Sequence, residues 1–200
     1  MIGQTKIVFA RLDGEWMPLL INQSFSDGYV HDFLKIARVC LVFKNGDASE
    51  IRNYRPISIL PSFSKFFENW FAICNLQDCK ITLLRTIVLT NNQFGLCSKH
   101  DASMAVIEIV DKISKAMVNS EYSAGIFIDL SKAFDTLDHH ILFDKLEHSG
   151  IRGIALNWFK SYLTNRVQYI EYNNAQSKML STKRGVSQGS ILEPILFLSI

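Results

Sequence analysis

An acidic residue follows a run of apolar, strand-forming residues in FIDLSKAFDTLDHH, residues 127–140. Alternation along 126–130 places Phe127 and Asp129 on one face of an extended segment. A carboxylate buried there without a partner costs several kcal/mol, roughly, unless it is paired or coordinates a metal. The carboxylate of Asp129 and the backbone carbonyl of Leu130 are the hard oxygen ligands that Mg²⁺ prefers. The simpler alternative is an aspartate that faces solvent or caps the next turn.

The residues just after Asp129 have two expected roles: one would line the space beside the metal, and others would cap a helix. Phe134 follows Asp129 after a turn and would line whatever the metal holds. Asp135 and Asp138 are expected to cap a helix that begins near His139. His139 and His140 are adjacent, so on a helix they point in different directions and are not expected to share a metal.

A second candidate site is the loop in KRGVSQGSILEP, residues 183–194. Gly185 and Gly189 flank Gln188, and glycine allows positive φ and a close approach of the backbone to a ligand. A helix starting at Ser190 would direct its N–H groups at this loop, which suits a phosphate or a base edge. A plain Gly-Ser turn between a hairpin and a helix has the same sequence.

Two cations form the third candidate. Arg55 and Lys65 lie in and after NYRPISILPSFSK and suit phosphate contacts. The simpler alternative is that both side chains face solvent and bind nothing.

The elements that must position these residues are both helical and extended. Residues 69–90 lack a clean apolar period, so we expect them to be the least ordered part of the domain. Hairpin-linked strands rather than regular βαβ units favour an α+β fold. The expected elements are a helix ending near 25, strands at 36–43 and 122–130, an extended segment at 53–61, helices from 62, at 103–118 (capped by Ser98 or Asp101), at 139–149 and at 154–163, a hairpin turning near Asn173–Asn174, and an apolar helix from 190.

Composition narrows the class of protein only broadly. The 200 residues are 48% hydrophobic and 20% charged, which is globular rather than disordered composition. A net charge of +2 neither requires nor excludes a nucleic-acid partner. No apolar run is long enough to span a bilayer. The four cysteines form no C-x-x-C pair, which favours free thiols in a reducing compartment over disulfides or zinc.

The candidate sites also occur together in one known family. GDASEIRNYRPISILPSFSKFFE, NNQFG, AGIFIDLSKAFDTLDHHIL, KLEHSGIRGIALNWFKSYLTNRVQYI and RGVSQGSILEPILFL follow one another in the family's order. From about Leu19 to the last residue, with a gap near 69–90, the chain resembles the reverse transcriptase domain of jockey-like non-LTR retrotransposons.

The resemblance implies a partial right-hand polymerase without a thumb. Fingers would cover roughly 36–120 and the palm, with antiparallel strands and packed helices, roughly 121–200; residues 1–18 stay unassigned. It implies an RNA template, a DNA primer, deoxynucleotides and Mg²⁺ as partners, and an endonuclease domain upstream of this chain.

Residue by residue, the resemblance makes Asp129 the first catalytic aspartate, which binds metal together with the Leu130 carbonyl. Phe134 matches the bulky residue that stacks under the incoming sugar and rejects a 2′-hydroxyl. Gln188 and Gly189 match the loop that touches the incoming nucleotide and the template. Arg55 and Lys65 resemble the basic residues of the fingers that hold the triphosphate.

Departures from the family limit what the resemblance implies. The family's later aromatic-x-Asp-Asp hairpin, which completes the metal site, occurs nowhere in this sequence. Glu193 stands where the family usually has Gly, and Ser187 where it usually has Pro. We therefore predict a reverse transcriptase fragment that is inactive alone. The alternatives are a non-catalytic nucleic-acid-binding remnant of a decayed element, or a chain with no molecular function.

Overall fold

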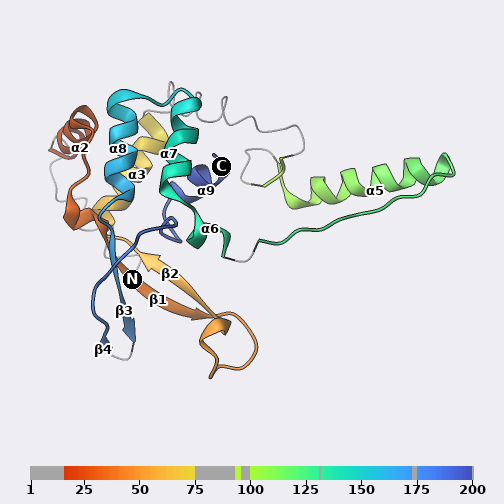
Figure 1. Ribbon diagram of the computed structural model, residues 1–200, viewed down its shortest axis with the longest axis horizontal. Coiled ribbons are helices and arrows are strands. Elements are labelled where there is room, and N and C mark those ends of the chain that lie inside the picture. Colours follow the sequence, from red (N-terminus) through yellow and green to blue (C-terminus); the bar gives the residue numbers. More distant parts are fainter. Residues whose placement is uncertain (1–15, 75–92, 96–99, 131, 173–174, 200) are drawn as a thin grey trace. The chain divides into compact units, whose positions relative to one another are not determined.

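The computed structural model describes residues 16–74, 93–95, 100–130, 132–172 and 175–199. They fall into two units, one within Met1–Ile87 and Ala133–Ile200 and the other within Val88–Lys132. The helices in these ranges are α2 (Trp16–Asp27), α3 (Ser62–Cys74), α5 (Ala102–Val118), α6 (Ala133–Thr136), α7 (His139–His148), α8 (Gly153–Leu163) and α9 (Glu193–Leu198). The strands are β1 (Ile36–Phe43), β2 (Tyr54–Ile59), β3 (Val167–Tyr172), β4 (Ala175–Gln176) and β5 (Leu180–Ser181) (Figure 1).

The sheet belongs to the first unit and has the order β2-β1-β3-β4, with β5 also paired to β3. β1 and β2 form an antiparallel hairpin whose loop contains Gly46 at φ 90°. β3 forms a second antiparallel arrangement with β4 and β5, as the predicted hairpin requires. β1 and β3, however, run parallel, with Ile36 opposite Val167.

The predicted α+β class is therefore confirmed. The strands within residues 121–200 pair antiparallel, as expected, whereas the parallel pairing of β1 with β3 was not predicted. Each hairpin closes locally through a short connection, but the two hairpins meet through β1 and β3. These two strands are joined by a long connection, which is what parallel neighbours need. The sheet is consequently mixed.

The core of the first unit lies where its helices gather near one end of the sheet (Figure 1). Leu142 and Leu146 are fully buried one helical turn apart on α7. On α8, Trp158 is 1% exposed, and its ring lies 4.9 Å from that of Phe25 on α2 and 5.4 Å from that of Tyr162. The rings join α2 to α8, and α7 contacts α8 in the same core.

Two predicted helix starts are confirmed by their caps. The Asp138 carboxylate accepts a hydrogen bond from His140 N at 2.9 Å at the start of α7. The Asp101 carboxylate accepts one from Met104 N at 3.0 Å at the start of α5. Each cap satisfies a backbone N–H that has no partner inside its helix.

The strand predicted at 122–130 is wrong. Residues 121–130 have no regular secondary structure, and no strand pairing among the described residues includes them. Ile126, Phe127 and Ile128 are 80–90% exposed. Alternation can predict which side chains share a face, but a strand also needs neighbours that accept and donate its backbone hydrogen bonds.

Two further boundaries differ from the predictions. The last helix begins at Glu193 instead of Ser190, with Pro194 in its first turn, a position where proline's missing N–H costs nothing. Helix α3 continues to Cys74, so the first part of the stretch 69–90 is helical; residues 75–90 lie outside the described residues. No helix within the described ranges is long and apolar enough to cross a membrane.

Candidate functional site

The chain after β5 forms a loop that is fixed to α6 and α7. Gly185 has φ 79°, and a Cβ there would lie 2.8 Å from the carbonyl oxygens of Phe134 and Asp135. Its N–H donates to the Leu137 carbonyl at 2.8 Å, and its own carbonyl accepts from His139 Nε2 at 2.7 Å. Only glycine fits this approach, because any side chain would meet backbone atoms.

Further along the loop, Gln188 and Gly189 lie against β2, the edge strand of the sheet. The Gln188 carbonyl accepts a hydrogen bond from Ser58 N on β2 at 2.9 Å. Gly189 has φ 102°, and a Cβ there would lie 3.3 Å from the Ser58 carbonyl oxygen. The two predicted glycines thus both adopt the positive φ that the sequence suggested, and each passes close to another element. The segment 185–191 is called the Gln188 loop below.

Glu193 stabilises this loop from its C-terminal side. Its Oε2 accepts a hydrogen bond from Gly189 N at 2.5 Å, while its own N–H donates to Ser190 Oγ at 3.0 Å. The arrangement resembles a capping box, except that the carboxylate accepts the N–H of Gly189 instead of that of Ser190. The residue that departs from the family pattern therefore takes part in holding the loop.

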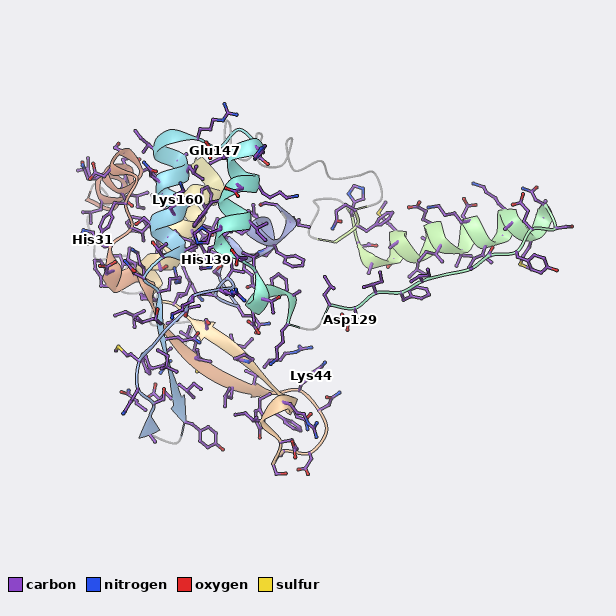
Figure 2. All side chains as sticks on the ribbon, in the orientation of Figure 1. His31, Lys44, Asp129, His139, Glu147 and Lys160 are labelled. Carbon is purple, nitrogen blue, oxygen red and sulfur yellow. The ribbon has the colours of Figure 1, made fainter. Side chains whose placement is uncertain are left out.

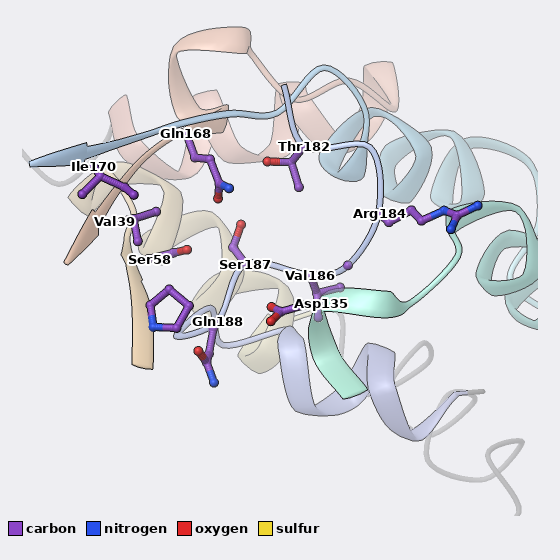
Figure 3. Close-up of a pocket in the computed structure, with 12 residues that line it drawn as sticks. Val39, Ser58, Asp135, Gln168, Ile170, Thr182, Arg184, Val186, Ser187 and Gln188 are labelled. Carbon is purple, nitrogen blue, oxygen red and sulfur yellow. The ribbon is translucent and has the colours of Figure 1, made fainter. Parts of the chain in front are cut away.

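The Gln188 loop forms one side of a pocket with a volume of about 260 Å³. The strands contribute the opposite side (Figure 3). The pocket is lined by Val39 on β1, Pro56 and Ser58 on β2, Gln168 and Ile170 on β3, Asp135 on α6, and Thr182, Arg184, Gly185, Val186, Ser187 and Gln188 after β5. In Figure 3 the polar ends of Gln168 and Ser187 point into the pocket, and Arg184 points away from it.

Carboxylates and one arginine set the charge around this pocket. Burial raises the pKa of Glu193, and the neighbouring charge of Asp135 raises it further. The pKa of Asp138 is lowered, chiefly by the hydrogen bond from His140 N and to a smaller extent by Arg184, whose Nε lies 3.8 Å from its carboxylate. The pocket is thus not a simple cationic phosphate site.

Phe134, predicted to line the nucleotide side, lies beside the Gln188 loop. Its ring is tilted against that of Phe197 on α9, with 4.5 Å between ring centroids. Its carbonyl accepts a hydrogen bond from Val186 N at 3.0 Å. The structure therefore joins Phe134 to the loop through its backbone and to α9 through its ring.

The two predicted cations are not among the residues that line this pocket. Arg55 is exposed on β2 opposite Val42, and alternation along β2 puts it on the face opposite Pro56 and Ser58. Lys65 is exposed on α3. Their contact with a triphosphate remains a prediction.

Asp129 and Leu130 belong to the second unit. Both are exposed, at the end of the irregular segment after α5 (Figure 2). Among the residues that the structure describes, no three His, Cys, Asp or Glu side chains gather into a metal site. One carboxylate and one carbonyl do not make a site for two divalent ions, so the described residues do not fit the family's metal pair. The placement of Asp129 toward Gln188 remains a prediction.

Sequence reasoning missed several residues that shape this site. Asp135 was expected to be a helix cap, but it lies in α6 and lines the pocket. His139 was given no role beyond not sharing a metal with His140, but it is buried and its Nε2 donates to the Gly185 carbonyl. Nothing in the sequence singles out Ser58, because its N–H reaches the Gln188 carbonyl only once the chain has folded. For Asp135 and His139, their closeness to a glycine-flanked loop appears only after folding.

Comparison with known proteins identifies the class to which this fold and loop belong. The family model for reverse transcriptase (RNA-dependent DNA polymerase) matches residues 42–200, and the chain belongs to this family. It is distantly homologous to jockey-like non-LTR retrotransposon reverse transcriptases over most of its length.

Three curated relatives illustrate this. The RNA-directed DNA polymerase from mobile element jockey of Drosophila melanogaster is 29% identical over 92% of this chain and 20% of its own length. The probable RNA-directed DNA polymerase from transposon BS of the same species is 32% identical over 82% of the chain and 18% of its own length. The Pol polyprotein from type-1 retrotransposable element R2 of Popillia japonica is 26% identical over 80% of the chain and 22% of its own length. The chain thus spans about a fifth of the length of these relatives.

Proposed function

We propose that this chain is part of an RNA-directed DNA polymerase domain of a retrotransposon, and that the pocket beside the Gln188 loop receives part of the incoming deoxynucleotide opposite an RNA template. The observation that carries this proposal is the loop itself. It lies inside the matched range 42–200, and its Gln188–Gly189 backbone is held against β2 by the hydrogen bond from Ser58 N.

The geometry of the pocket supports a nucleotide fragment as the ligand. Its volume of about 260 Å³ is just below the roughly 300 Å³ at which pockets for small molecules begin, so it suits a base or a sugar and not a whole triphosphate. Polar ends from Gln168 and Ser187 offer hydrogen bonds to such a group, while Val39 and Ile170 offer apolar surface.

The finer roles follow from the family resemblance. In this proposal residues 36–120 are the fingers and 121–200 the palm. Asp129 and Leu130 contribute to a Mg²⁺ site, Phe134 selects against a 2′-hydroxyl, and Arg55 and Lys65 contact the triphosphate from outside the pocket.

The 200-residue chain alone is proposed to be inactive in primer extension. Two closely held metal ions are needed to stabilise charge on the attacking and leaving oxygens of phosphoryl transfer. Asp129 and the Leu130 carbonyl cannot hold both, and the sequence has no Asp-Asp pair to complete the site. Glu193 is not free to substitute, because its carboxylate accepts the Gly189 N–H.

Nucleotide binding tests the proposed role of the pocket. A fluorescent deoxynucleoside triphosphate is titrated into the chain in the presence of an RNA template annealed to a DNA primer. Gln188→Ala is expected to weaken binding about tenfold, the effect of losing roughly 1.4 kcal/mol. Gln176→Ala, an exposed glutamine on β4, is the matched control and should bind as the unsubstituted chain does.

The same titration separates the alternatives. Binding of template and primer without any nucleotide binding would favour a non-catalytic nucleic-acid-binding remnant. If neither binds, both proposals are wrong.

A further inference from the structure

A buried carboxylate on α3 lies outside the pocket and has no role in the function proposed above. Glu68 is 0% exposed. An ionised carboxylate is rarely buried to this extent unless hydrogen bonds and a nearby cation compensate for the lost water. Its partners therefore indicate what it is for.

Each oxygen of this carboxylate has one hydrogen-bond donor, and the two donors come from different parts of the chain. Oε1 accepts from the Tyr162 hydroxyl on α8 at 2.7 Å. Oε2 accepts from Ile191 N, the last residue of the Gln188 loop, also at 2.7 Å. Glu68 thus connects α3 and α8 to the loop from inside the core.

The charged and titratable groups around Glu68 offset only part of the effect of its burial, and its pKa is raised. Arg166 is 3% exposed, and its guanidinium lies 4.8 Å from the centre of the Tyr162 ring. Burial raises the pKa of Glu68, whereas its hydrogen bonds with Tyr162 and Ile191 and the charges of Arg166 and Lys65 act in the opposite direction. Glu193 is the neighbouring acid, and Glu68 contributes to its raised pKa.

The other hydrogen bonds of the loop show why this one matters. The Gly189 N–H donates to Glu193, and the Ser190 N–H donates to the Ser187 carbonyl at 3.0 Å, so both are local. The Gln188 carbonyl reaches β2 on the pocket side. The start of the loop is bound to α6 and α7 through Gly185 and Val186, whereas the Ile191 N–H ties its last residue to α3.

We propose that Glu68 is a positioning residue for the Gln188 loop: by accepting the Ile191 N–H, its carboxylate fixes how residues 187–189 face the pocket. The consequence for nucleotide affinity rests on the function proposed above. The positioning itself does not, and it can be measured without a nucleotide.

The test measures amide hydrogen exchange and NMR shifts in the full chain. Glu68→Met keeps a side chain of similar length but removes both acceptors, so exchange at Ile191 should rise at least about tenfold. Glu68→Gln keeps one carbonyl acceptor and should recover most of the protection. The Leu142 N–H, bonded inside the helical core to the Asp138 carbonyl, reports whether the fold as a whole has been lost.

A second readout does not depend on the Met variant folding. In the unsubstituted chain, the Ile191 amide shift should follow the titration of the Glu68 carboxyl as pH is changed, and this titration should vanish in Glu68→Gln. The proposal is overturned if Ile191 keeps its full protection in a folded Glu68→Met variant, or if its titration persists in Glu68→Gln.

Nucleotide titration then connects the positioning to function. Triphosphate affinity is expected to fall about tenfold in Glu68→Met and to return toward its original value in Glu68→Gln. If the unsubstituted chain binds no nucleotide, the proposed function fails while the exchange and shift measurements still decide the role of Glu68.

Discussion

The Gln188 loop and the segment 121–130 carry the two strongest signals of the sequence, but they differ in how they are held. The loop has no regular secondary structure, yet hydrogen bonds from β2, α3 and α9 fix its backbone. The segment before Asp129 alternates like a strand, yet it is irregular and exposed. Long-range partners, and not local pattern, therefore decide which of the two is a formed site in this structure.

The difference has a physical cause. A glycine-flanked turn needs only a few close backbone contacts to adopt a single conformation. Neighbouring elements of the first unit supply these contacts. An apolar alternating segment needs a whole row of paired backbone groups before its strand preference is realised. The comparison predicts that substitutions at the loop's contacts have large effects and that those at local features have small ones.

The largest expected effect is at Gly185. Gly185→Ala forces a Cβ to within 2.8 Å of two backbone oxygens at φ 79°, so the free energy of unfolding should fall by about 3 kcal/mol or more. Gly153→Ala is the matched control, because Gly153 has φ 60° but nothing within 4 Å of its Cβ position; it should cost only about 1 kcal/mol. Urea unfolding measures both. Equal losses would mean that the close approach to α6 is absent.

The pH dependence of stability gives the next effect. The folded pKa of Glu68 is raised above its ordinary 4.5, so the folded state binds this proton more tightly than the unfolded chain. The contribution of Glu68 is therefore fully present below about 4.5 and is lost as pH rises through the raised value. Relative to Glu68→Gln, the free energy of unfolding should fall by about 1.4 kcal/mol for each unit of the shift.

Asp138 supplies a control of opposite sign for this measurement. Its folded pKa is lowered by the His140 N–H, so its contribution is present above its ordinary 3.8 and is lost as pH falls through the lowered value. Denaturant unfolding over a pH series, with Glu68→Gln and Asp138→Asn, tests both signs. The raised pKa of Glu68 would be contradicted if the stability of the unsubstituted chain, relative to Glu68→Gln, rose with pH.

The smallest effect is expected at a local feature of the second unit. Asp101→Ala removes the cap of α5 and should lower the stability of its first turn by about 1 kcal/mol. Asp111→Ala removes only the exposed pair with Lys115 and should have a smaller effect, because solvent screens an exposed i,i+4 pair. Amide exchange along α5 ranks the two. A larger effect from Asp111→Ala would show that the cap is not formed in solution.

Local chemistry explains what could be predicted from the sequence. Signals that neighbouring residues carry predict the helix 103–118 with its Asp101 cap, the hairpin around β3, and the positive φ at Gly185 and Gly189. What could not be predicted depended on partners far along the chain: the parallel pairing of β1 with β3, which no local pattern indicates, and the absence of the strand that was expected before Asp129. The contact of Glu68 with Ile191 joins residues 123 positions apart, and no local pattern indicates it.

Primer extension tests most directly the proposal that the Gln188 loop faces the incoming nucleotide while the described residues hold no complete metal site. The chain is incubated with an RNA template, a DNA primer, deoxynucleotides and Mg²⁺ or Mn²⁺, with Asp129→Ala as the control. We predict that template, primer and nucleotide bind and that no primer is extended by either protein. Extension by the unsubstituted chain that disappears in Asp129→Ala would contradict this proposal. It would mean that other carboxylates complete a catalytic metal site together with Asp129.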